Sequence, residues 1–101
     1  MVLNNVWENY FPIGEEGDLA FYIGLLFSYI GNDFDALRFF EYSHELYGAS
    51  AEIYYKIAAC FYNLSEIEKA LEFTDKSLAL DPVLEESRAL KILIDEQIKY
   101  I

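Results

Sequence analysis

The feature that most constrains the fold of this chain is an internal repeat. When the sequence is shifted by 34 positions, residues 21–46 align on residues 55–80 without a gap, and we call this shift the repeat period. Small residues meet small ones, and large apolar residues meet large ones. The matched pairs include Phe21 with Tyr55, Ile23 with Ile57, Gly24 with Ala58, Phe27 with Phe61, Ala36 with Ala70, Leu37 with Leu71 and Leu46 with Leu80. Such self-similarity is typical of proteins built from stacked copies of one unit.

The second unit has the pattern of two helices joined by a turn. Apolar residues follow helical spacing from Ile53 to Leu64, which predicts the first helix. Ser65 and Glu68 have the spacing of a capping box, which predicts that the next helix begins directly after Ser65. The unit is therefore expected to be helix, turn, helix.

The first unit has the same pattern, with different turn residues. Gly31 is expected to adopt the left-handed conformation that ends a helix, because glycine has no Cβ to oppose it. Asp33 is then expected to cap a second helix over residues 34–47. The two predicted turns are one repeat period apart.

These residues resemble the tetratricopeptide repeat (TPR) family, whose unit of about 34 residues has small residues and an aromatic at fixed places and ends in a proline. The second unit matches at Tyr54, Ile57, Ala58, Phe61, Ala70 and Pro82. The first matches at Ile23, Gly24, Phe27, Ala36 and Phe40, and departs from the pattern at Ala20 and Gly48. The resemblance covers residues 18–82 and implies an all-α fold, a right-handed α-solenoid of antiparallel helix pairs.

The chain has 101 residues, a length that suits a single domain. Four parts are expected: an N-terminal helix and loop (1–17), repeat one (18–50), repeat two (51–82) and a C-terminal capping helix (83–101). The flanking helices would cover faces that a helical pair leaves open.

Both flanking helices have an apolar side. The N-terminal one is expected to present Val2, Leu3, Val6, Trp7 and Tyr10. The C-terminal one is expected to start at Pro82, behind Asp81 as its cap, with Leu84, Ala89, Ile92, Leu93 and Ile98 along one side.

The chain is strongly acidic, with a formal net charge of −11 and no basic residue before Arg38. Nucleic acid and anionic lipid are therefore not expected as partners, because both are negatively charged and bind basic patches. A protein surface that is basic or apolar suits the charge better. The acidity could equally serve solubility.

An uncharged run extends from Leu19 to Gly31. A membrane-spanning helix needs about 20 apolar residues, so this run is too short. A signal peptide carries a positive region ahead of its apolar run, whereas acidic residues precede this one. We expect a cytoplasmic protein, or alternatively the soluble domain of a membrane-anchored one, and this chain gives no indication of membrane contact.

The residues that perform catalysis or bind metals are scarce. Cys60 is the only cysteine and is expected to be a small buried apolar residue. His44 is the only histidine, and its chain neighbours Ser43 and Glu45 point in other directions on a helix. Phosphate-binding, EF-hand and zinc motifs are absent from the sequence. The sequence therefore predicts neither an enzyme nor a cofactor or metal site.

The resemblance implies a concave surface, lined by the first helix of each unit, that holds a peptide or a partner helix. The positions facing this surface are Asp18, Phe21, Leu25 and Ser28 in unit one and Glu52, Tyr55, Ala59 and Tyr62 in unit two, with Lys56 and Asn63 at the margin. One branch of the family binds C-terminal carboxylates with Lys, Arg and Asn in the groove. That specificity is not expected here, because Phe21 and Leu25 occupy corresponding places and Lys56 stands alone. The predicted binding residues are Phe21, Leu25, Ser28, Tyr55, Lys56, Ala59 and Tyr62.

The supply of aromatic residues exceeds what a small core needs. The predicted core consists of Ile23, Phe27, Phe40, Ile57, Phe61, Phe73 and Leu78. In the helix over 34–47, Phe39, Phe40, Tyr42, Leu46 and Tyr47 are spread around most of the circumference, so some of them should face outward.

Two functional hypotheses follow. The first is a non-enzymatic scaffold that binds an apolar segment carrying Lys or Arg, in a groove with an acidic edge. The second is a structural homo-oligomerisation domain, whose groove is filled by its own terminal helix or by a second chain. In that case Trp7, Phe39 and Tyr42 are the predicted self-association residues, and a homodimer is expected.

Overall fold

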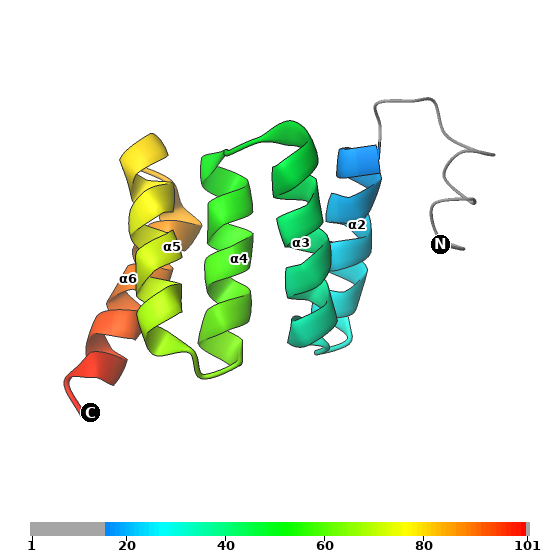
Figure 1. The fold of residues 1–101 in the computed structure, drawn as a ribbon. Coiled ribbons are helices and arrows are strands. Elements are labelled where there is room, and N and C mark those ends of the chain that lie inside the picture. The colour runs from blue at the N-terminus through cyan, green and yellow to red at the C-terminus, as the bar shows by residue number, and fades with distance from the viewer. Residues whose placement is uncertain (1–15, 101) are drawn as a thin grey trace.

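The computed structural model describes residues 16–100, which contain five α-helices and no strand. With the labels of Figure 1, the helices are α2 (Glu16–Tyr29), α3 (Asp33–Tyr47), α4 (Ala51–Asn63), α5 (Ile67–Leu80) and α6 (Glu85–Ile98). This part of the chain is all-α, as predicted. The N-terminal helix expected within residues 1–17 falls almost wholly outside the described residues.

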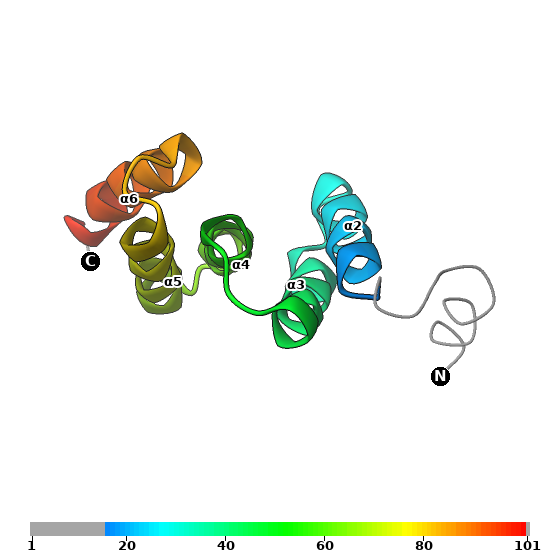
Figure 2. The ribbon, with the colours of Figure 1, turned by 90° about the horizontal axis from the view of Figure 1, so that it is seen from above.

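The helices lie side by side in chain order and run in alternating directions (Figure 1). Each packs on its neighbour along the chain, and α4 also contacts α6. Seen from above, α2, α4 and α6 line one side of the array and α3 and α5 the other (Figure 2). The starts of α3 and α5 are one repeat period apart, and so are those of α4 and α6, as their bounds show.

The turns after α2 and α4 have the same backbone form. Gly31 and Ser65 occupy equivalent places in the two units, and both have positive φ, at 80° and 65°. In each turn the next residue donates a backbone hydrogen bond to a carbonyl in the last turn of the helix, from Asn32 to Phe27 and from Glu66 to Phe61, both at 2.9 Å. These are the bonds of a Schellman helix end. The prediction for Gly31 is confirmed.

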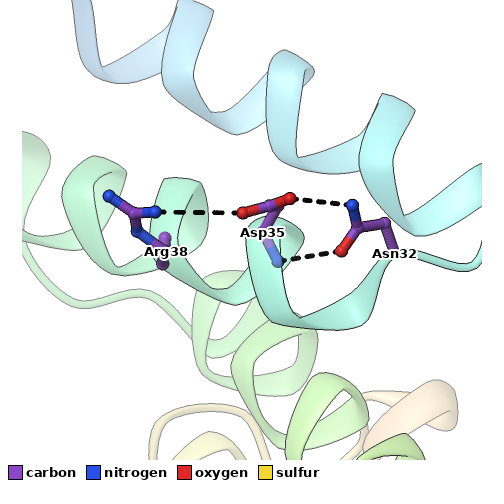
Figure 3. Close-up of polar contacts among 3 residues, drawn as sticks. All are labelled: Asn32, Asp35 and Arg38. Atoms are coloured by element: carbon purple, nitrogen blue, oxygen red, sulfur yellow. Dashed lines mark hydrogen bonds and ion pairs between the residues drawn. The ribbon is translucent and has the colours of Figure 1, made fainter.

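The predicted helix caps were wrong in both units. The cap of α3 is Asn32, whose side chain accepts a bond from the Asp35 amide at 3.3 Å and donates one to Asp35 Oδ2 at 2.7 Å (Figure 3). Arg38 lies 3.9 Å from the other carboxylate oxygen of Asp35. Asp33, the predicted cap, is the first helical residue. The Ser65–Glu68 capping box does not form either, because Ser65 lies in the turn after α4 and no side chain caps α5.

The last helix also begins later than predicted. Asp81 ends α5 instead of capping α6, and its carboxylate accepts a bond from the Val83 amide at 3.2 Å. The helix starts at Glu85 without a side-chain capping bond. Pro82 therefore lies in a turn between two helices.

The buried side of α6 differs from the predicted one. Its buried residues are Ser87, Leu90 and Ile94, whereas Ile92 is 64% exposed and Leu93 is 51% exposed. Apolar residues occur on two sides of this helix, and only the side facing α4 and α5 is covered. Within residues 16–100 no helix follows α6, so its other apolar side stays open in this part of the chain.

The core consists of two clusters of buried residues. The first joins α3 to α4 and contains Ala36, Leu37, Phe40, Ile53, Ile57 and Cys60. The second joins α4, α5 and α6 and contains Ala58, Ala70, Leu90 and Ile94. Of the predicted core, Phe40 and Ile57 are buried. The others are half-buried: Phe27, Phe61 and Phe73, which pack against the clusters, and Ile23 and Leu78.

Gly24 allows α2 to approach α3 closely. A Cβ atom at this position would lie 2.7 Å from Cε1 of the buried Phe40 ring, which is closer than packed carbon atoms approach.

No helix in the described part of the chain combines the length and apolar character needed to cross a membrane.

Candidate protein-binding groove

An open groove lies between α2 and α4. Its first section has a volume of about 350 Å³ and is lined by Phe21, Tyr22, Ser43, Tyr47, Gly48, Ala49, Ser50, Glu52 and Ile53. Its second section, of about 460 Å³, is lined by Leu25, Ser28, Tyr29 and Lys56. Phe21 and Leu25 are one turn apart on α2, and Glu52 and Lys56 are one turn apart on α4. The two sections are therefore consecutive parts of one surface, which we call the α2–α4 groove.

The predicted binding residues of repeat one all line this groove. Phe21 is half-buried, with its ring centroid 5.6 Å from that of Phe40. Leu25 is also half-buried and packs against the first core cluster, while Ser28 is exposed at the edge. Asp18 lies in α2. Phe21 and Leu25 thus contribute to the core on one side and to the groove on the other.

Most of the predicted binding residues of repeat two pack against the second core cluster instead. Tyr55, Ala59 and Tyr62 are half-buried and pack against the second cluster, to which α6 contributes Leu90 and Ile94. Burial raises the pKa of the Tyr55 hydroxyl, and the Glu86 carboxylate of α6 raises it further. Part of the surface that repeat two was expected to offer a partner thus faces a cluster to which the terminal helix contributes.

The two positions predicted at the margin have different places. Lys56 lines the groove, with its ammonium nitrogen 5.4 Å from the centroid of the Tyr55 ring. Asn63 donates a hydrogen bond to the Asp33 carboxylate at 3.1 Å, which links α4 to the start of α3. Asn63 thus has a partner within the fold.

The groove also contains residues that the sequence did not identify as binding residues. Tyr22 and Tyr29 line it from α2, and both are exposed, at 61% and 88%. Ser43 and Tyr47 line it from α3, and the loop 48–50 closes one end. The helical spacing of Tyr22 and Tyr29 with Leu25 offered a signal for α2. The loop residues offered none, because their place depends on how α3 packs against α4.

Glu52 and Lys56 are the charged residues of the groove lining, one in each section. The remaining lining is mainly aromatic, aliphatic or small. Because the two charges lie one turn apart, the groove has an acidic part and a basic part along the α4 axis.

The predicted self-association residues are not prominent on the described surface. Phe39 is half-buried and stacks on Phe27 with ring centroids 5.6 Å apart, and Tyr42 is half-buried. Trp7 lies outside the described residues. The apolar residues of α3 that face outward include Leu46 and Tyr47, at 46% and 50% exposed.

His44 and Cys60 both pack within the fold. The His44 ring packs 5.4 Å from the Tyr54 ring. Cys60 is buried, and burial together with the weaker effect of the Asp33 carboxylate raises the pKa of its thiol to about 12. Among residues 16–100, no three metal-ligating side chains gather where they could hold an ion.

Comparison of the sequence with protein-family models and with curated proteins finds no match. The geometry and chemistry of the α2–α4 groove are therefore the basis for a functional proposal.

Proposed function

We propose that this chain is a TPR-like domain, a right-handed α-solenoid that serves as a non-enzymatic protein-interaction module. Support for the repeat architecture comes from helix starts and helix-ending turns that recur after one repeat period. Support for the function comes from the α2–α4 groove. The observation that most favours binding is that Phe21, Leu25 and Glu52 line one open surface.

The proposed partner is a peptide or helix with apolar residues and at least one Lys or Arg. The apolar residues would cover the exposed parts of Phe21 and Leu25, and the basic residue would meet Glu52. A net charge of −11 would also attract a cationic partner over distance, most strongly at low salt. Lys56 would favour an acidic group one turn further along the partner, which would set its direction in the groove.

The charge assignment can be tested with Glu52→Lys. A partner isolated by affinity purification and mass spectrometry is reduced to its binding peptide, and its affinity is measured by fluorescence anisotropy. Reversing the charge should weaken binding by about tenfold, because an attraction becomes a repulsion. Glu45→Lys is the matched control, since it makes the same change at an exposed position of α3 outside the groove lining.

The apolar part can be tested with Leu25→Ala, which shortens a groove side chain. We expect weaker binding with the circular dichroism spectrum of the wild type. Phe21→Ala is less suitable, because Phe21 also packs on Phe40 and its loss would reduce stability. The groove assignment is wrong if neither Glu52→Lys nor Leu25→Ala changes the affinity.

A second candidate function is homo-oligomerisation. It is favoured by the packing of Tyr55, Ala59 and Tyr62 against the second cluster, which leaves them less open to a partner. The exposed Ile92 and Leu93 on the far side of α6 favour it as well. Sedimentation at micromolar concentration tests it. A strict monomer would contradict this candidate and leave the groove proposal intact.

A further inference from the structure

The side of α6 that points away from the core is a line of exposed residues, which we call the α6 stripe. Helix α6 lies at one end of the array, next to α5 (Figure 2). Its buried residues Ser87, Leu90 and Ile94 face the fold. The opposite side has, at helical spacing, the exposed residues Glu85, Arg88, Ile92, Glu96 and Lys99. Lys99 directly follows the last helical residue and keeps helical φ and ψ.

The charges of the α6 stripe make it complementary to itself. Arg88 lies four residues before Ile92, and Glu96 lies four residues after it. Glu85 lies seven residues before Ile92, and Lys99 lies seven residues after it. If two stripes pack antiparallel about Ile92, each basic residue therefore faces an acidic residue of the other copy. A parallel pair would instead place like charges together.

The charged residues of the α6 stripe are open to a second copy. Glu85 and Arg88 take part in no ion pair within residues 16–100. Lys99 Nζ lies 3.0 Å from Glu96 Oε1, but both side chains are more than half exposed, so this pair contributes little in water. The stripe has two acidic and two basic residues and thus no net charge, in a chain whose net charge is −11. A second acidic copy can therefore approach here with little local repulsion.

The α6 stripe does not suit a helix that packs as α5 packs on α4. One repeat period before Ile92 is Ala58, which is fully buried in the cluster that joins α4 to α5, and two periods before it is Gly24. The longer side chain of Ile92 would hold such a helix away. One period before Asp95 is Phe61, so the same helix would bury a carboxylate in place of a ring. The stripe therefore favours a partner that meets Ile92 at a wider spacing and pairs with its charges.

We propose that two copies of the chain form an antiparallel dimer through the α6 stripe, with Ile92 at the two-fold axis. Such an interface uses the same surface on both copies. The exposed Ala89 and Leu93 would widen its apolar centre. The proposal names the contact surface for the homo-oligomerisation candidate and rests on that candidate, whereas the α2–α4 groove takes no part in it. A helix of 14 residues is about 21 Å long, so the contact is small and the dissociation constant should be on the order of 10 μM.

A first experiment tests the charge pairs by exchanging them. Sedimentation equilibrium of the full chain, from roughly 1 to 300 μM, measures the dissociation constant of the dimer. Arg88→Glu should raise it by about tenfold or more, because both copies of one attraction become repulsions. Adding Glu96→Arg should bring it back to within about threefold of the wild type, since the pairs form again with reversed sign. The double variant also keeps α6 intact, because it places an acid near the helix start and a base near its end.

Arg38→Glu is the matched control, since it makes the same change of charge at an exposed position of α3. It should change the dissociation constant much less than Arg88→Glu does. A dimer that responds equally to both variants, or that Glu96→Arg does not rescue, would overturn the α6 stripe as the contact and leave the homo-oligomerisation candidate intact. A wild-type chain that stays monomeric over the whole range would overturn both.

A second experiment tests the antiparallel direction by cross-linking. Ile92→Cys should form a disulfide between copies under mild oxidation, because the two residues meet at the axis. Glu85→Cys should form one much more slowly, since the two positions would lie about 21 Å apart along the helices. Phe34→Cys, at a residue of α3 that is 63% exposed, gives the rate of random collision. Cys60 is buried and should not compete.

The oxidation rates can contradict the proposal in two ways. A disulfide that forms faster from Glu85→Cys than from Ile92→Cys would show a parallel pair. Equal rates for Ile92→Cys and Phe34→Cys would show that residue 92 does not lie at a contact between copies. Either result would overturn the proposed dimer.

Discussion

Repeat one (α2 and α3) and repeat two (α4 and α5) place different side chains at the same close contact between helices. In repeat one the contact pairs Gly24 with Phe40, whose ring leaves no room for a Cβ atom on the glycine. In repeat two the equivalent residues are Ala58 and Thr74, both fully buried. A methyl group is added on one helix and a ring is removed from the other. The two units therefore preserve the space at the contact and not the residues that fill it.

The surroundings of the second helix differ as well. In repeat two the buried Ser77 hydroxyl donates to the Ala51 carbonyl at 2.7 Å and lies 2.6 Å from the Ser87 hydroxyl of α6. The positions one repeat period earlier hold Ser43 and Ile53. The junction with α6 thus uses buried hydrogen bonds at a place where the junction of α3 with α4 has an apolar residue.

The largest change in stability is expected when Phe40 is replaced by threonine, the residue type that Thr74 has at the equivalent position of repeat two. Phe40→Thr should lower the free energy of unfolding by about 3–5 kcal/mol, because it leaves a cavity beside Gly24. The new hydroxyl can donate to the Ala36 carbonyl, as Thr74 Oγ1 does to the Ala70 carbonyl at 2.7 Å. Urea denaturation followed by circular dichroism measures the change.

The paired substitution shows whether the two positions share one space. Gly24→Ala alone should cost about 1–3 kcal/mol by overpacking. Added to Phe40→Thr, however, it should restore about 1 kcal/mol, since the methyl group fills part of the cavity. If the two losses simply add, the contact is not shared and the comparison of the repeats is wrong on this point.

The next largest effect is expected at the polar junction with α6. Ser77→Ala should lower the free energy of unfolding by about 1–3 kcal/mol, because the buried Ser87 hydroxyl and the Ala51 carbonyl both lose the hydrogen bond that they share with Ser77. Adding Ser87→Ala should cost little more, since it removes one of the unpaired groups. Thermal unfolding of the two single variants and the double variant tests this, and additive losses would contradict a shared hydrogen-bond chain.

The residues before α3 and α5 should differ in their contribution to stability, by a smaller amount than the changes above. Asn32→Ala should cost about 1 kcal/mol, because Asn32 bonds the Asp35 amide at the start of α3. Glu66→Ala, at the equivalent position before α5, should change stability much less, since no side-chain capping bond is lost there. Equal losses in denaturant unfolding would show that the two caps are energetically alike.

The smallest effect is expected from exchanging the residues at the two helix-ending turns. Ser65→Gly should raise the free energy of unfolding by roughly 0.5–1 kcal/mol, because serine at φ 65° is strained by its Cβ. Gly31→Ser should lower it by a similar amount. Calorimetric melting temperatures should therefore move in opposite directions, and a shift of the same sign in both variants would contradict the equivalence of the turns.

Several features of the fold could be predicted from the sequence because they depend on local spacing. The repeat period indicated the four central helices, and Gly31 indicated the end of α2. The capping residues could not be chosen from sequence, since polar residues cluster at each turn and any of them could cap. Asn32 caps α3 in preference to Asp33 because the Schellman turn ends at Asn32. Ser65 is similarly used by the turn and so is not available as a cap.

The groove could be predicted only in part. The resemblance to the TPR family implied that Phe21, Leu25 and Ser28 face a groove, and these three residues of α2 do line the α2–α4 groove. The same resemblance implied that Tyr55, Ala59 and Tyr62 of α4 face the groove, but they pack against the second cluster, which includes Leu90 and Ile94 of α6. Periodicity identifies which residues share a side of a helix, but it contains no information on which neighbour will cover that side.

The sequence by itself determined the helical repeat, the place of the first turn and the small residues that let helices approach, because each follows from contacts within one or two turns of backbone. The tertiary structure decided which apolar sides are core and which are open. It directed Leu90 and Ile94 of α6 inward and left Ile92 and Leu93 outside. It also limited the open groove to α2, α3 and the near edge of α4, because burial depends on the neighbours that packing brings to each side of a helix.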